Sequence, residues 1–542
     1  MRNLPNVAYF CMEYALNAEM KSYAGGLGIL AGDYLKGAKE FNYPVTGIGI
    51  NWKQGYSDQI IGKDGKPYDA FHNYKYDFLK DTGVKVTVRI RQRNVICKVW
   101  LVDKYDNAPI YLLDTDLPEN EDAWITGQLY GWFGEERIAQ EMVLGIGGVR
   151  ALRALGIEPD VYHFNEGHAL FAGIELIREK INAGQSFEEA FENTKKQIVF
   201  TTHTPIIQGN ESHYMDRLLY MGADCGLTIE QLLRIGGAPF NMTVGALRLS
   251  KISNGVAQLH KETANKMWKD IQGRSQIIGI TNAIHIKTWV DEGMLKAVES
   301  YKGSKESRNK LWERHMKNKK ALIDFVYERN GVKLDADKLL IGFSRRAAPY
   351  KRSNLIFSDP QKIDPLLKSG KLQIVFSGKA HPLDNGGKEI VENIVKTSKQ
   401  YPGSVVFLEN YDMTIGAMLT KGSDVWLNNP RRPLEASGTS GMKAAMNGVL
   451  NCSILDGWWP EACEDGINGW QFGDGFESED YEKLDEHDKD ALYKVLLDKV
   501  IPTYYENRNK WIDMMAASIN STKGFFSVKR MLEEYFQLMY MA

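Results

Sequence analysis

The sequence predicts an α/β protein built around two sheets. Short apolar runs rich in β-branched residues alternate with longer segments at helical spacing, a pattern typical of parallel strands joined by helices. Strand-like runs such as 44–52 and 196–206 lie in the first half, and a second series follows a charged, helix-prone stretch at 291–329. We therefore expect an N-terminal lobe over residues 1–282 and a C-terminal lobe over 283–542, with a final helical segment able to pack back on the first lobe.

One segment of the first lobe departs from the α/β pattern. Residues 84–102 alternate between apolar and polar side chains at period two around the sequence Gln92-Arg93-Asn94. This alternation predicts a β-hairpin inserted into the first lobe.

Charge and composition exclude several classes of partner. The 542 residues carry 67 Lys+Arg against 69 Asp+Glu, a formal charge of -2, which argues against nucleic acid or an anionic membrane as partner. No apolar stretch reaches the roughly 18 residues of a membrane span and no signal peptide is visible, so we expect a cytoplasmic protein. The five cysteines form no CxxC pair, which argues against disulfides and zinc knuckles.

Two short motifs in the first lobe suggest ligand sites without defining them. Residues 25–31 contain a GxGxxA match, but no strand directly precedes it, which argues against a dinucleotide fingerprint. The segment is then either an anion-binding glycine loop or a plain tight turn. The histidines of His163-Phe-Asn-Glu166-Gly-His168 are five residues apart, unlike the i, i+4 pair of helical zinc motifs. We therefore predict no metal there, and leave open a helix-capping or hinge role and a sugar-binding role.

Two motifs in the second lobe indicate phosphate chemistry. Ser440 and Lys443 fit SxxK, but the companion motifs of penicillin-binding proteins are absent. A lysine early in a helix opened by glycine and serine suits instead a phosphate-bearing aldehyde cofactor held as a Schiff base. Four cationic residues lie within residues 345–352, directly after the strand-like run 339–344. This segment is either a solvated basic face or a loop that binds phosphate.

Taken in order, these segments resemble the glycogen or α-glucan phosphorylases. The most specific match is EASGTSGMK at 435–443, followed by Asn447-Gly448 and Leu455-Asp456-Gly457; supporting segments are SYAGGLGILAGDYL, HFNEGHALF, FTTHTP, GITNAIHIKTW, RRAAPYKR, FSGKAHP and VFLENYD. They extend over about four fifths of the chain. The resemblance implies two Rossmann-like lobes with a deep cleft between them, a glycosyltransferase-B-like fold, and pyridoxal 5'-phosphate as cofactor.

The resemblance also implies a role for individual residues. Lys443 would carry the cofactor as an imine, and Arg346 and Lys351 would bind the substrate phosphate; with His203 they form the expected catalytic set. The expected cofactor-lining residues are Lys443, Thr439, Ser440, Arg345, Trp289 and Tyr411. The expected substrate-binding residues are Gly25, Gly26, His203, Asn282, Tyr350, Glu435, Ser437 and Gly438, of which the two glycines would donate backbone N–H groups to the phosphate.

Four positions depart from the family pattern. Ala15 stands where a cofactor-lining tyrosine is more usual, Arg345 where lysine is common, Asp412 where arginine often contacts the cofactor phosphate, and Gly441 where asparagine is frequent. These changes affect the phosphate cage that the resemblance implies.

The expected reaction is phosphorolysis of an α-1,4-glucan or maltooligosaccharide to α-glucose 1-phosphate with retention. A nucleotide-sugar glycosyltransferase of the same fold, which needs no imine at Lys443, and an inactive glucan-binding protein are the alternatives. Because strand-like residues 7–10 begin close to Met1, no extension of the kind that carries regulatory sites in larger members is expected, and hence no activation by AMP. A homo-oligomer is compatible with the sequence.

Overall fold

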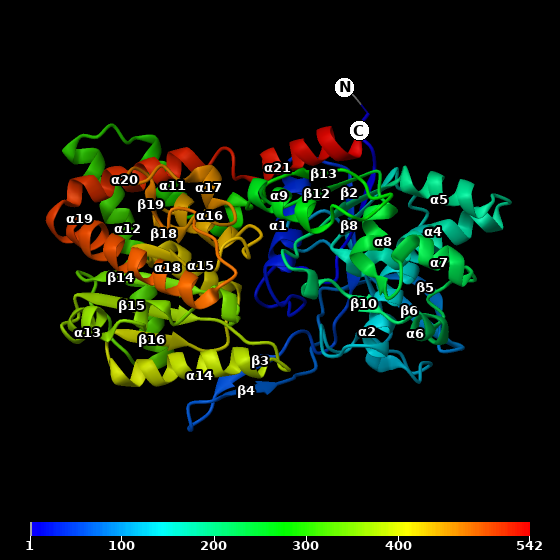
Figure 1. Ribbon diagram of the computed structural model, residues 1–542, viewed down its shortest axis with the longest axis horizontal. Coiled ribbons are helices and arrows are strands. Elements are labelled where there is room, and N and C mark those ends of the chain that lie inside the picture. The colour runs from blue at the N-terminus through cyan, green and yellow to red at the C-terminus, as the bar shows by residue number, and fades with distance from the viewer. Residues whose placement is uncertain (1–2) are drawn as a thin grey trace. The chain divides into compact units, whose positions relative to one another are not determined.

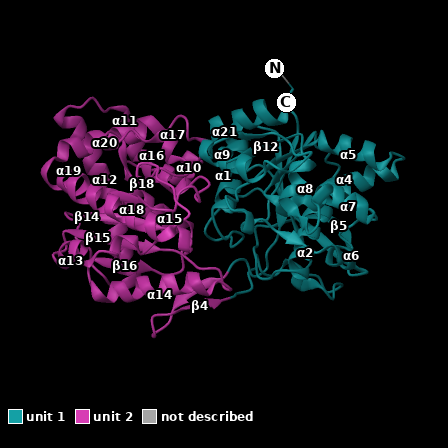
Figure 2. Cartoon of the chain, viewed as in Figure 1, with its two compact units in different colours: residues 1–56, 71–282, 528–542 teal, residues 57–70, 283–527 magenta. Residues whose placement is uncertain are grey.

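The computed structural model describes residues 3–542 and divides them into two compact units. Unit 1 contains residues 3–56, 71–282 and 528–542, and unit 2 contains residues 57–70 and 283–527 (Figure 2). Strands and helices alternate in both units, which confirms the α/β class. Within the described residues, the structure contains no helix with the length and apolarity that crossing a bilayer requires.

Unit 1 is built on a nine-stranded sheet with the order β13-β12-β9-β8-β1-β2-β7-β6-β5 (Figure 1). Its strands are β1 (Val7–Phe10), β2 (Val45–Ile50), β5 (Lys80–Ile90), β6 (Arg93–Val102), β7 (Ile110–Asp114), β8 (Val161–Asn165), β9 (Ile198–Thr201), β12 (Ile252–Gly255) and β13 (Ile277–Gly279), and a small pair is formed by β10 (Ser212–His213) and β11 (Phe240–Asn241). Its helices are α1 (Gly26–Glu40), α2 (Glu135–Met142), α3 (Gly148–Ala154), α4 (Leu170–Asn182), α5 (Phe187–Lys195), α6 (Met215–Met221), α7 (Ile229–Gly236), α8 (Met242–Arg248), α9 (Gln258–Met267) and α21 (Val528–Tyr535).

The hairpin segment lies at one edge of this sheet. Strands β5 and β6 pair antiparallel, and Arg91 and Gln92 form the turn between them with positive φ angles. β6 also pairs antiparallel with β7, while the strands from β7 to β13 pair in parallel. The hairpin therefore extends the parallel sheet at its edge instead of forming a separate insertion.

Unit 2 is built on a fully parallel six-stranded sheet with the order β16-β15-β14-β17-β18-β19. Its strands are β14 (Leu339–Ser344), β15 (Leu372–Ser377), β16 (Val405–Leu408), β17 (Val425–Asn428), β18 (Leu450–Ile454) and β19 (Gly469–Phe472), with a separate hairpin of β3 (Asp58–Ile61) and β4 (Pro67–Ala70). Its helices are α10 (Ile286–Trp289), α11 (Glu292–Glu299), α12 (Lys305–Asn330), α13 (Pro360–Lys368), α14 (Asn385–Gln400), α15 (Met413–Gly422), α16 (Thr439–Met446), α17 (Trp459–Ala462), α18 (Tyr481–Val495), α19 (Ile501–Glu506) and α20 (Arg508–Thr522).

The two faces of the six-stranded sheet belong to different hydrophobic cores. Leu340 of β14 packs in one core with residues of α12 and α15, whereas Leu339 and Ile341 of the same strand pack in another core with residues of α13, α14 and α18. Successive side chains of a strand point to opposite faces, so a strand with helices on both sides is apolar along its whole length. This explains why the strand-like runs of the second half read as continuous apolar segments.

Two segments lie outside the linear boundaries of the lobes, of which the sequence analysis had allowed for the second, the final helix. Residues 57–70 belong to unit 2 because Gln59 exchanges two hydrogen bonds with the backbone of Ala380, at 3.0 and 3.1 Å. α21 belongs to unit 1, where Val528 packs so closely on α1 that a Cβ added at Gly37 would lie 2.6 Å from it. These long-range contacts leave no local signal in the sequence.

A buried ion cluster connects α12 to the sheet of unit 2. The Asp424 carboxylate, which is fully buried, accepts hydrogen bonds from His315 Nε2 at 2.7 Å, Lys319 Nζ at 2.6 Å and the Leu340 N–H at 2.8 Å. Although burial raises the pKa of Asp424, the charge of Lys319 and the bond from His315 lower it below its usual range. The cluster therefore holds an ionised carboxylate beneath β14, the strand that leads into the cationic loop.

Asp424→Ala should destabilise the protein by about 3–5 kcal/mol, because it leaves the Lys319 ammonium buried without its counter-ion. Urea unfolding of the two proteins measures the difference. The exposed Asp337→Ala is the matched control and should change stability by less than about 0.5 kcal/mol. A loss below about 1 kcal/mol for Asp424→Ala would contradict a stabilising role for the cluster.

Candidate functional site

The cationic loop follows β14 at the carboxyl end of the unit 2 sheet. There the Glu435 carboxylate, nearly buried, accepts hydrogen bonds from the Arg345 guanidinium and from Lys351 Nζ, the latter at 3.3 Å. Burial raises the pKa of Glu435. The positive charges of Arg345 and Lys351 together lower it by more than burial raises it, so the pKa lies below its usual value. The structure thus brings together three predicted residues from segments about 90 positions apart around one ionised carboxylate.

Arg346 and Tyr350 flank this group. Arg346 is exposed, and its charge also contributes to the low pKa of Glu435. Lys351 Nζ lies 5.0 Å from the centroid of the Tyr350 ring, while the Tyr350 carbonyl accepts the Arg431 N–H at 2.8 Å. The loop therefore presents one solvated guanidinium beside two nearly buried cations.

Asp456 fixes the backbone of the segment that carries Glu435. One carboxylate oxygen accepts the Glu435 N–H at 2.9 Å and the other accepts the Gly457 N–H at 2.8 Å, while the Trp458 N–H donates to the Ser437 carbonyl. Asp456 is fully buried, and this burial raises its pKa to about 8. Asp456 is a positioning residue. The sequence analysis named it within a matching motif but gave it no role in the site, although its place directly after a strand-like run was a usable signal.

The second group of predicted residues in unit 2 surrounds the start of α16. Gly438 precedes the helix in a left-handed conformation with φ of 92°, and Thr439 and Ser440 are its first residues. Lys443, only 3% exposed, follows on the next turn with its Nζ 3.5 Å from the centroid of the Trp289 ring. A buried amine thus lies close to a helix N-terminus, where unpaired N–H groups favour an anion.

Several buried polar atoms near these strand ends have no hydrogen-bond partner among the described residues. They include the predicted Ser437 Oγ and, at the end of β17, Asn428 Oδ1, whereas Ser344 at the end of β14 lies within hydrogen-bonding reach of Tyr411. Buried polar groups without a partner are costly, and such atoms commonly bond to a ligand. Ser344 and Asn428 were missed by the sequence analysis; their signal is a polar side chain that ends an otherwise apolar strand.

Two departures from the family pattern have local structural explanations, and for a third, Ala15, the structure offers none. Asp412 caps α15, where its carboxylate accepts the Ile415 N–H at 2.9 Å. Gly441 lies against Trp458, so that a Cβ at position 441 would come within 2.7 Å of the indole nitrogen. The Ala15 backbone pairs with α1 through an N–H bond to the Gly28 carbonyl at 2.8 Å. Next to Asp412, the partly buried Tyr411 has its pKa raised by burial to about 12.

Unit 1 contains the remaining predicted residues. Gly25 precedes α1 and Gly26 opens it, and a Cβ added at either position would meet no atom within 4 Å. The Gly25 N–H donates to Glu13 Oε2 at 3.1 Å, so this group, expected to bind an anion, is bonded within the protein. The donors left for a ligand are therefore the first N–H groups of α1 itself.

His203 and Asn282 lie in the same unit with acceptor atoms available to a ligand. His203 Nε2 bonds Asn165 Oδ1 at 2.6 Å and the His203 N–H donates to Glu166 at 2.8 Å. Burial, with smaller effects of His260 and His168, lowers the pKa of His203 to about 3, so the imidazole is neutral. Because Nε2 donates to Asn165, Nδ1 is an acceptor. The Asn282 side chain is 4% exposed and its Oδ1 has no hydrogen-bond partner within the described residues.

Comparison with known proteins identifies relatives along nearly the whole chain. The sequence profile of the carbohydrate phosphorylases matches residues 248–496. A maltodextrin phosphorylase of Thermococcus litoralis is 38% identical over 98% of this chain and 70% of its own length, and a glycogen phosphorylase of Aquifex aeolicus is 34% identical over 98% and 86%. An uncharacterized protein of Methanocaldococcus jannaschii is 35% identical over 98% of this chain and 99% of its own length.

The raised pKa of Asp456 predicts a specific pH dependence of stability. A carboxyl group with a pKa of about 8 when folded and 3.8 otherwise favours folding most below about pH 4, and this contribution is lost as the pH rises to about 8. Asp456→Asn is uncharged throughout. The free energy of unfolding of the wild type relative to this variant should therefore fall between about pH 5 and about pH 8 in urea titrations. An increase over that range would show that Asp456 is ionised in the folded protein.

Proposed function

The chain belongs to the carbohydrate phosphorylase family, and on this premise we propose that it is an α-1,4-glucan phosphorylase. Inorganic phosphate would cleave a terminal glucosyl unit from a glucan or maltooligosaccharide and give α-glucose 1-phosphate with retention. The observation that carries the proposal is the arrangement in unit 2, where a cationic loop shares the Glu435 carboxylate and a buried lysine follows a helix N-terminus.

The residues around α16 fit a pyridoxal 5'-phosphate cofactor. Lys443 would bind its aldehyde carbon, Trp289 and Tyr411 would line its ring, and the start of α16 at Thr439 and Ser440, with Arg345, would bind its phosphate. Such a fit is supported by the buried amine of Lys443 and by the partnerless Ser437 Oγ beside the helix start. When bound, the cofactor supplies a phosphate group that can exchange a proton with the substrate phosphate.

The chain's own residues would bind and orient the substrates. Arg346 and Lys351 would offset the repulsion between phosphate groups, since charge-assisted bonds from guanidinium and ammonium stabilise phosphate oxyanions. Glu435, kept ionised by its cations, would accept hydrogen bonds from sugar hydroxyls, and the Ser437 hydroxyl and the Gly438 backbone would add further contacts.

Two unit 1 residues are proposed to bind the glucosyl unit near its 6-hydroxyl. Neutral His203 offers its Nδ1 and Asn282 offers its partnerless Oδ1, both as acceptors for a sugar hydroxyl. Neither introduces a charge, which suits a neutral sugar beside a phosphate.

Borohydride reduction of the holoenzyme should place a pyridoxyl group on Lys443, detected by peptide mass analysis. Lys351→Ala should retain this adduct, because the two buried lysines have separate roles, whereas Lys443→Arg should show none. An adduct on Lys351, or a holoenzyme with the cofactor's absorption band but no adduct at Lys443, would refute the assignment. A nucleotide-sugar transferase would also show no adduct.

Arg346→Ala should lower kcat/KM for phosphate roughly tenfold to a hundredfold, because it removes a charge-assisted contact worth on the order of 1.5–3 kcal/mol. Initial rates of maltooligosaccharide phosphorolysis measured against phosphate concentration give the effect, which we expect mainly in the apparent KM for phosphate.

Arg329→Ala, an exposed arginine of α12, is the matched control and should keep wild-type kinetics. If folded Arg346→Ala holoenzyme had unchanged phosphate kinetics, Arg346 would have no role in binding phosphate.

A further inference from the structure

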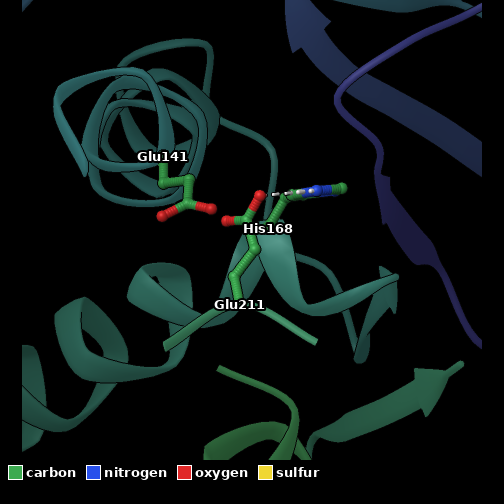
Figure 3. A group of neighbouring side chains, drawn as sticks. All are labelled: Glu141, His168 and Glu211. Atoms are coloured by element: carbon green, nitrogen blue, oxygen red, sulfur yellow. Dashed lines mark ion pairs between the residues drawn. The ribbon is translucent and has the colours of Figure 1, made fainter. Parts of the chain in front are cut away.

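A cluster of two carboxylates and an imidazole lies in unit 1 apart from the residues assigned above. Glu141 comes from α2, His168 from the short turn Gly167–Ala169 after β8, and Glu211 from the segment before β10. One ligand-type atom from each residue lies within 4.8 Å of the other two. Figure 3 shows the two carboxylates pointing toward each other, with His168 beside Glu211.

The facing oxygens of this cluster are buried and lack hydrogen-bond donors. Glu141 is fully buried; its Oε2 bonds His213 Nε2 at 2.9 Å, but its Oε1 has no hydrogen-bond partner in the described part of the chain. Arg137 bonds Glu211 Oε1, whereas Glu211 Oε2 has no partner within residues 3–542. Both carboxylates thus use one oxygen for a protein contact and turn the other, partnerless, oxygen inward.

The charges of the surrounding groups do not balance. Arg137 supplies one positive charge for two carboxylates. Two facing ionised carboxylates repel each other unless a cation or a proton lies between them.

We propose that Glu141, His168 and Glu211 bind a divalent transition-metal ion such as Zn²⁺ or Mn²⁺. A shared proton would satisfy two oxygens, but it would not account for the imidazole, which lies as a third donor 3.7 Å from Glu211. Mixed carboxylate and imidazole donors are the ligands that such ions take in proteins. The other histidine of the HFNEGH run lies elsewhere, since His163 bonds Tyr540 and Thr201.

The ion would stabilise the segments that hold the glycine loop. The Tyr130 ring lies 5.7 Å from the His168 ring, and its hydroxyl donates to Glu13 Oε1 at 2.9 Å. Glu13 in turn accepts the N–H groups of Ala24 and Gly25 just before α1. The sequence predicted no metal here, because two of the three ligands come from outside the motif that contains His168.

The test is titration of the chelator-treated, full-length holoenzyme with Zn²⁺ and with Mn²⁺ by calorimetry, together with elemental analysis of protein purified without a chelator or a histidine tag. We expect about one ion per chain and a higher melting temperature with metal. Glu141→Gln and Glu211→Gln should weaken binding about tenfold or more, since even outer-shell changes cost that much. Glu230→Gln, exposed on α7, should bind as the wild type does.

Two results would overturn the proposal. The first is that the wild type binds neither Zn²⁺ nor Mn²⁺. If the Glu141→Gln variant were then as stable as the wild type, the two carboxylates would share a proton instead of an ion. If Glu141→Gln fails to fold, His168→Ala, at the less buried side of the cluster, provides the second variant, and unchanged metal affinity in that variant would equally contradict the site. None of these readouts uses phosphorolysis, so the outcome is independent of the proposed reaction.

Discussion

The Glu435 carboxylate, held between Arg345 and Lys351, is the interaction on which the unit 2 site depends. It is nearly buried, and an ion at such a position is stable only when its charge is balanced and its oxygens are bonded. The two cations meet this condition, and in return the carboxylate holds them at the end of β14. Asp456 accepts the N–H of the same residue, so two kinds of contact fix Glu435: the cations hold its carboxylate, and Asp456 holds its backbone.

This arrangement requires the parallel sheet. The carboxyl ends of parallel strands meet at one edge, so Arg345 after β14 and Asp456 after β18 reach the same region although more than 100 residues separate them. Asp424, directly before β17, connects this sheet to α12: it accepts hydrogen bonds from His315 and Lys319 of α12 and from the Leu340 N–H of β14. Buried charges in unit 2 therefore serve both the scaffold and the site, in each case with a compensated carboxylate.

Unit 1 holds its glycine loop in a similar way, with a buried carboxylate as acceptor. Glu13 binds the N–H groups of Ala24 and Gly25 and approaches α1 so closely that a Cβ at Gly28 would lie 2.7 Å from its Oε2. The loop is therefore shaped by the protein, and among its glycines Gly28 is needed for this close approach, whereas Gly25 and Gly26 face open space. Burial raises the pKa of Glu13, and the N–H bonds and Tyr130 act in the opposite direction.

The sequence by itself determined the α/β class, most strands, and the residues proposed for the unit 2 site other than Asp456, Ser344 and Asn428. These features are local: apolar runs define strands, and the cationic loop and the EASGTSGMK segment are contiguous in the chain. The four-residue strands β12 and β19 were not predicted, because β12 contains one apolar residue and the four residues of β19 are too few to establish a period. Only the tertiary structure decided that residues 57–70 belong to unit 2, that Gly25 bonds Glu13, and that Glu141 and Glu211 meet at His168. Each of these contacts joins segments distant in the chain, and its energy comes from burial and charge balance that no local pattern records.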